Sequence, residues 1–99
     1  MSSHPNQLDI PDPAVPDPKA FEIIRIWAGQ GKQLVTIRTE LWDDPAAWGM
    51  MLVDLAHHVA NAYEQIEGRD RVEVLARLRQ GFDAEWADQT DTPIGRVSG

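Results

Sequence analysis

The stretch from Asp44 to Gly68 constrains the fold more than any other part of the chain, because it predicts one long amphipathic helix. Asp44 and Pro45 are typical of a helix start, and Gly68 is typical of a helix end. Met50 and Val53 are apolar but lie to the side of the main stripe, so we expect them to be singly exposed or to form a second contact face. The main stripe has three- and four-residue spacing and consists of Trp48, Met51, Leu52, Leu55, Val59, Ala62, Tyr63 and Ile66.

Two strands are predicted before this helix. Residues 21–28 are dense in β-branched and aromatic side chains, and residues 33–41 alternate between apolar and polar side chains. The sequence Gly29-Gln30-Gly31-Lys32 between them predicts a hairpin turn with glycines available for positive φ. It lacks the glycine spacing of a phosphate-binding loop, and a strand follows it where such a loop requires a helix.

A second amphipathic helix is predicted after Gly68, with Asp70 as its capping residue. Its apolar positions and the arginine beside them share one stripe: Arg71, Leu75, Leu78, Phe82 and Trp86. Gly81 lies within this helix and predicts either a break or a close approach of another helix.

The resulting fold class is α+β, with a hairpin followed by two helices (ββαα) that pack on one face of the hairpin sheet. We expect one domain at residues 20–88, between a disordered proline-rich arm at residues 1–19 and a disordered tail at residues 89–99. A two-stranded sheet is marginal alone, and the first strand carries apolar residues on both faces, among them Ile24 and Trp27. These features predict completion by a second copy, as a homodimer; the alternative is a monomer whose sheet edges are protected by charged residues.

Composition narrows the classes of function. The formal net charge of −7 argues against nucleic acid and against an anionic membrane surface as the main partner. The absence of cysteine excludes disulfides, thiolate metal sites and cysteine catalysis. Residues 1–20 lack the pattern of a signal peptide, and no apolar run is long enough to span a membrane, so we expect a cytoplasmic protein. No cofactor is expected.

Two groups of side chains are candidate sites. Asp54, His57 and His58 can reach one flank of the long helix, which suits a metal site; the alternative is a solvated flank with an ion pair between residues one turn apart. Trp42 and Trp48 flank the corner between strand and helix, where they can form an aromatic floor for a small ligand or simply nucleate the core. Serine occurs only in the predicted arm and tail, so no nucleophile for catalysis is nominated.

Three segments resemble a family of small bacterial proteins, mainly alphaproteobacterial, that is known as a domain of unknown function. They are Phe-Glu-Ile-Ile-Arg-Ile-Trp from residue 21, Trp-Asp-Asp-Pro-Ala-Ala-Trp-Gly from residue 42 and Asp-Leu-Ala-His-His-Val-Ala from residue 54. The resemblance covers about residues 20–90 and implies no activity, cofactor or catalytic residue. The favoured function is therefore a non-enzymatic module that acts by self-association or by binding a protein partner. A metal-binding protein or small enzyme, and a small-ligand binder, are the alternatives.

Overall fold

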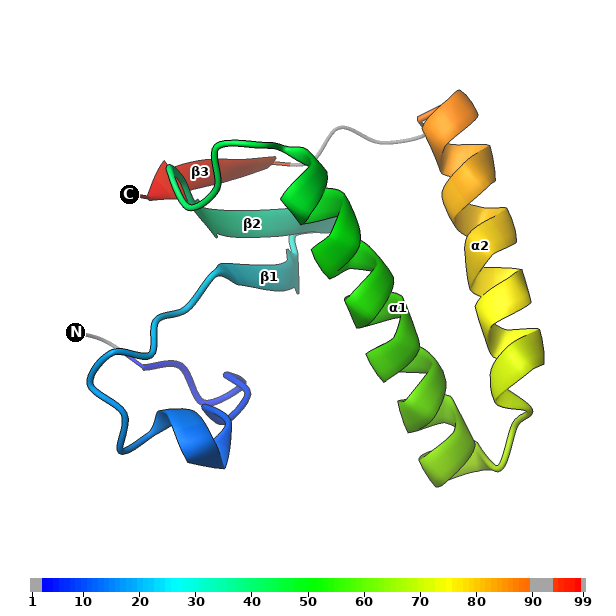
Figure 1. Cartoon of the computed structure of the whole chain (residues 1–99), viewed down its shortest axis with the longest axis horizontal. Coiled ribbons are helices and arrows are strands. Elements are labelled where there is room, and N and C mark those ends of the chain that lie inside the picture. The colour runs from blue at the N-terminus through cyan, green and yellow to red at the C-terminus, as the bar shows by residue number, and fades with distance from the viewer. Residues whose placement is uncertain (1–2, 90–93, 99) are drawn as a thin grey trace.

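The computed structural model of the protein describes residues 3–89 and 94–98 and has an α+β architecture. Its elements in chain order are η1 (Asp12–Ala14), β1 (Ile24–Gly29), β2 (Lys32–Arg38), α1 (Ala46–Glu67), α2 (Arg71–Ala87) and β3 (Ile94–Ser98), as Figure 1 shows. The predicted hairpin followed by two helices is confirmed.

The hairpin of β1 and β2 is antiparallel, with a register that runs from Ile24 opposite Ile37 to Gly29 opposite Lys32. Gln30 and Gly31 form its two-residue turn with φ angles of 55° and 70°. Positive φ at both positions is the signature of a type I′ turn, whose twist matches that of the strands. β2 ends three residues before the predicted boundary at Leu41, and the positive φ of 60° at Glu40 takes the chain out of the extended conformation there.

A third strand is present where the sequence predicted a disordered tail. β3 pairs in parallel with β2, from Leu34 opposite Ile94 to Arg38 opposite Ser98, and the strand order is β1-β2-β3. Parallel neighbours require a long crossover connection. The helical hairpin of α1 and α2 lies within that crossover, so the prediction of a tail is corrected for residues 94–98.

The helix boundaries follow from local hydrogen bonds. The Asp44 carboxylate accepts the N–H of Ala46 at 2.9 Å, at the start of α1. Gly68 ends α1 with a φ of 67° and donates its N–H to the carbonyl of Glu64 at 3.0 Å. Asp70 caps α2 by accepting the N–H of Val72 at 2.9 Å. Gly81 neither breaks α2 nor marks a close approach, because a Cβ placed there meets no atom within 4 Å.

The helices are packed less closely against the sheet than the sequence predicted. Among the described residues, no Cα atom of α1 or α2 lies within 8 Å of a strand Cα atom, so the expected coverage of one sheet face by both helices is not seen. The helices contact each other instead, with Ala60 at 0% and Val74 at 6% exposed, and these two are the buried apolar residues of the described chain. In Figure 1 α1 starts beside the sheet, and α2 lies on the side of α1 that faces away from the sheet.

The residues before β1 fold back toward the sheet. The His4 ring packs against the Trp27 ring, edge to face, with 4.9 Å between centroids. Nearer the strand, the Arg38 side chain donates to the carbonyl of Glu22 at 2.8 Å and lies 5.2 Å from the centroid of the Phe21 ring. These contacts connect the arm to the two strands of the hairpin.

Candidate functional site

The main apolar stripe of α1 is exposed. We define the α1 stripe as the side chains that recur on this face and are between 37% and 82% exposed: Leu52, Leu55, Val59, Tyr63 and Ile66. Near its end the Arg69 guanidinium lies 4.9 Å from the centroid of the Tyr63 ring. Apolar surface of this extent and continuity is typical of a contact with another surface.

The contact with α2 uses a different side of α1. Ala60 and Asn61 belong to that side, since Ala60 is buried and the Asn61 amide oxygen accepts from Nε of Arg71 at 2.7 Å. A position on a helix rotates by about 100° from the one before it. On this basis the centre of the α1 stripe is turned roughly 150° away from the side that meets α2. The stripe is therefore left uncovered by the neighbouring helix.

The helices also separate toward one end. They are closest to each other near the connection at residues 68–70 and diverge toward the start of α1 and the end of α2, as Figure 1 shows. We call the apolar residues at this end the open end of the helical hairpin: Met50, Val53, Phe82 and Trp86, all exposed, with Trp86 at 80%. The Phe82 and Trp86 rings are stacked, with centroids 5.6 Å apart.

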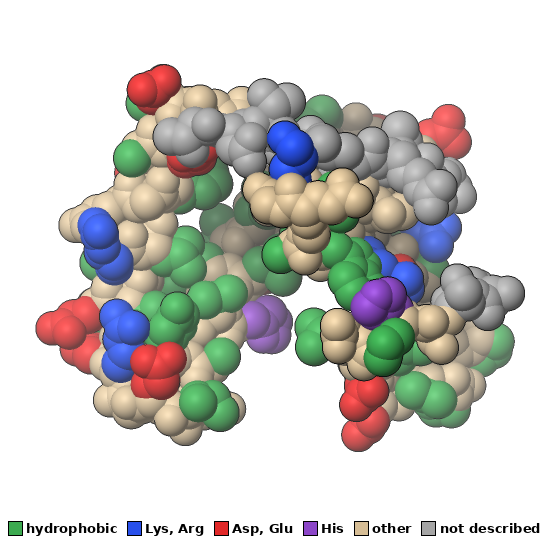
Figure 2. Space-filling model, turned by 180° about the vertical axis from the view of Figure 1, so that it is seen from behind, with side chains coloured by type: hydrophobic (Ala, Val, Ile, Leu, Met, Phe, Trp, Pro, Cys, Tyr) green, Lys and Arg blue, Asp and Glu red, His purple; other side chains and the backbone are tan. Residues whose placement is uncertain are grey.

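Both exposed surfaces belong to a limb of the molecule that stands apart from the rest. Figure 2 shows a hollow between the helical limb and the limb formed by the N-terminal residues. Hydrophobic side chains, green in Figure 2, face this hollow from both sides. The chain thus exposes apolar surface that a self-contained fold would bury.

The predicted metal ligands are not brought together. Among residues 3–89 and 94–98, no group of three or more histidine or acidic side chains is placed to hold a metal ion. His57 instead faces α2, where its Nδ1 accepts from a terminal nitrogen of Arg71 at 2.6 Å. Asp54 and His58 are exposed. The interhelical cluster of His57, Asn61 and Arg71 is a feature that the sequence analysis missed, since its arginine comes from the next helix.

The predicted aromatic corner is formed. The Trp42 and Trp48 rings meet edge to face with centroids 5.1 Å apart and an interplanar angle of 78°. This geometry is favourable for an aromatic pair. Whether the pair also receives a ligand stays a prediction.

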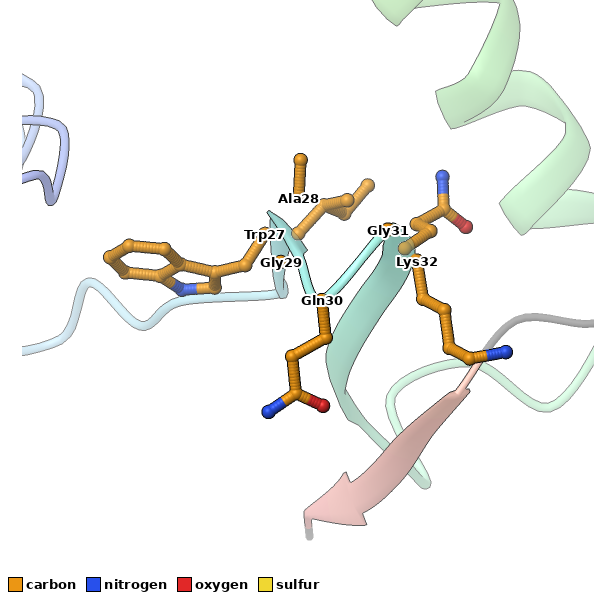
Figure 3. A pocket seen from close by; sticks show the side chains of 8 residues that line it. Trp27, Ala28, Gly29, Gln30, Gly31 and Lys32 are labelled. Atoms are coloured by element: carbon orange, nitrogen blue, oxygen red, sulfur yellow. The ribbon is translucent and has the colours of Figure 1, made fainter.

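The hairpin tip carries an open hollow of about 620 Å³, lined by Ile26, Trp27, Ala28, Gly29, Gln30, Gly31, Lys32 and Gln33. Figure 3 shows that the side chains of Trp27, Gln30 and Lys32 point in different directions rather than toward one centre. A ligand site needs polar groups that converge on the bound molecule. The hollow therefore lacks the geometry of a small-molecule site. The predicted interface residues Ile24 and Trp27 are half-buried, and the His4 ring lies against Trp27.

The fold and these surfaces define a small α+β domain with extensive exposed apolar surface on its helical hairpin. The chain belongs to the family described as Domain of unknown function (DUF5076), whose sequence profile matches residues 7–90. Among curated proteins no match was found.

A solved structure is also similar to the chain. It comes from the photosynthetic bacterium Rhodopseudomonas palustrus CGA009 and is provisionally named a pyruvate dehydrogenase. The two share 26% sequence identity with a TM-score of 0.72, over 99% of this chain and 100% of that chain. Within the part of the chain that the structure describes, neither helix is long and apolar enough to cross a membrane.

Proposed function

We propose that this chain is a self-association module that forms a homodimer through the α1 stripe. The observation that carries the proposal is the accessible surface of 8691 Å². A compact monomer of this mass, 11.1 kDa, is expected to expose about 5,700 Å². The surplus of roughly 3,000 Å² exceeds the area that each partner buries in a standard interface, which is about 800 Å².

The dimensions agree with this surplus. The radius of gyration is 15.5 Å, whereas a compact domain of this length has a value of about 12.6 Å. A chain that buries two apolar side chains among its described residues gains little free energy from its own core. Association supplies the missing burial.

A second copy is the occupant that the spacing of the stripe favours. Four residues of the stripe, together with the neighbouring Ala62, have this spacing: Leu52, Leu55, Val59, Ala62 and Ile66 follow one another at intervals of three, four, three and four residues. This is the repeat of a helix that packs along an identical helix. A twofold axis beside α1 then places each stripe on its counterpart, so that the same residues serve both partners.

The test is solution mass by light scattering after size exclusion, over a concentration series. We expect a dimer for the unchanged chain and a monomer when Leu55→Glu and Val59→Glu are combined, because both place carboxylates in the apolar seam. Val72→Glu is the matched control: Val72 is exposed on α2, outside both apolar surfaces, and its replacement should leave the dimer intact.

Circular dichroism separates dissociation from unfolding in these variants, and Tyr63→Glu provides a second, single replacement in the stripe. A monomeric mass for the unchanged chain at high concentration contradicts the proposal. So does a dimer that persists in both stripe variants.

The other expectations from the sequence have different support. Pairing of two copies through the edge strand β1, with Ile24 and Trp27 in the contact, stays a prediction that Ile24→Arg tests. The cytoplasmic location also stays a prediction. The hydrogen bond between His57 and Arg71 argues against the metal-binding alternative. The similar structure is named for a dehydrogenase function, and the proposal for this chain does not rest on that name.

A further inference from the structure

The open end of the helical hairpin is a second surface, separate from the α1 stripe. Phe82 and Trp86 follow Leu78 at four-residue intervals, so they continue the side of α2 that packs on α1. Val53 likewise continues the side of α1 that contains Ala60. The packing faces therefore extend beyond the point where the helices separate (Figure 1), and the apolar side chains on them are exposed among the described residues.

The charges around the open end are acidic. No lysine or arginine occurs between residues 39 and 68, and none between residues 80 and 89. The acidic residues nearest to the four apolar ones along the helices are Asp54, Asp83, Glu85 and Asp88. Arg79, the arginine nearest to Phe82 along α2, forms an ion pair with Asp83 at 2.9 Å. Acidic side chains also appear in red at the matching end of the helical limb in Figure 2.

From this combination we infer that the open end binds a basic amphipathic helix of another protein. Exposed apolar side chains on the inner sides of two diverging helices are the kind of surface that contacts the apolar face of a third helix. Phe82 and Trp86 supply the aromatic anchors that commonly dominate such contacts. Lysine or arginine on the flanks of the incoming helix complements the acidic rim and accelerates the encounter.

A second copy of this chain is disfavoured as the occupant of the same surface. Each copy brings the same acidic rim, so two open ends in contact place like charges directly together. The inference goes beyond the proposed dimer, since the stripe and the open end are different sides of the hairpin.

The probe is a synthetic peptide of about 18 residues, long enough for roughly five helical turns, in which leucine occupies positions i, i+3, i+4 and i+7 and lysine the rest. A second peptide replaces every lysine with glutamate. Titration of the full chain with each fluorescently labelled peptide should show micromolar binding of the lysine peptide that weakens with added salt, and no binding of the glutamate peptide.

Two variants locate the site. Trp86→Ala and Val53→Glu should each weaken binding of the lysine peptide at least tenfold, whereas Val72→Ala, which removes exposed apolar surface elsewhere on α2, should leave it unchanged. The Leu55→Glu and Val59→Glu chain should still bind the lysine peptide. This last result separates the open end from the stripe, whatever the mass of that variant.

Four outcomes overturn the inference. Equal binding of both peptides removes the role of charge, and unchanged affinity in Trp86→Ala places the peptide elsewhere. A lower solution mass for Trp86→Ala than for the unchanged chain shows that a second copy covers the open end. Absence of binding by the lysine peptide also contradicts it.

Discussion

Gln30 occupies a backbone conformation that glycine and asparagine tolerate better than glutamine. It is the first of the two turn residues between β1 and β2, and its φ of 55° lies in the left-handed region. A side chain with a Cβ atom pays about 1–2 kcal/mol there. The sequence located this turn through its glycines, but it did not indicate which residue would bear the strain.

Gln30→Asn should therefore stabilise the chain by about 0.5–1 kcal/mol, because Asn-Gly is the preferred pair in a type I′ turn. The measurement is the urea midpoint. Gly31→Ala is the contrasting variant and should destabilise the chain by a similar amount, since Gly31 has a φ of 70°. A lower midpoint for Gln30→Asn contradicts the turn geometry described above.

The interhelical cluster shows why side-chain partners were harder to predict than side-chain positions. The sequence correctly placed His57 on a helix, and its spacing from Asp54 suggested a metal ligand. The Arg71 side chain instead reaches back from α2 to both His57 and Asn61. The hydrogen-bond partners of Arg71 depend on how the two helices pack together, and no local sequence pattern carries that information.

At the scale of the elements, the helix boundaries that capping residues determine were predicted correctly. Gly68 and Asp70 end α1 and begin α2 as expected, because their signals act within one helical turn. β3 was missed for the opposite reason. Residues 94–98, Ile-Gly-Arg-Val-Ser, lack strong alternation and contain a glycine, so this strand depends on its pairing with β2 rather than on its own sequence.

Two glycines in the helical hairpin should respond oppositely to one replacement. Gly68→Ala should destabilise the chain by about 1 kcal/mol, because alanine is strained at its φ of 67°. Gly81→Ala should stabilise it by up to about 1 kcal/mol, because Gly81 is inside α2 with open space at its Cβ position. Thermal unfolding followed by circular dichroism compares them, and shifts of the same sign would contradict the conformations assigned to these glycines.

The degree of separation between the helices could not be predicted either. The sequence marked Met50 and Val53 as a possible second contact face and placed Phe82 and Trp86 on the inner stripe of the second helix. The structure joins these two observations at the open end, because the helices diverge there. Periodicity identifies the face of a helix, whereas the angle between two helices depends on the packing of their side chains.

At the scale of the whole molecule, stability should depend on protein concentration. If α1 gains its burial from a second copy, dilution removes that copy and lowers the melting temperature by mass action. We expect the melting temperature to rise steadily over a hundredfold increase in concentration, and to lose this dependence in the Leu55→Glu and Val59→Glu chain. A melting temperature independent of concentration in the unchanged protein would contradict coupled folding and association.

The parallel pairing of β3 with β2 also fixes the order in which the sheet can assemble. Leu34 pairs with Ile94, a separation of 94 − 34 = 60 residues, whereas every β1–β2 pair lies within one short hairpin. Contacts between distant residues form late because a long loop must first close. During synthesis on the ribosome, the strand hairpin and both helices are complete before the residues of β3 have emerged. Until then the outer edge of β2 is open, and this interval is when a nascent chain is most exposed to pairing with a neighbour.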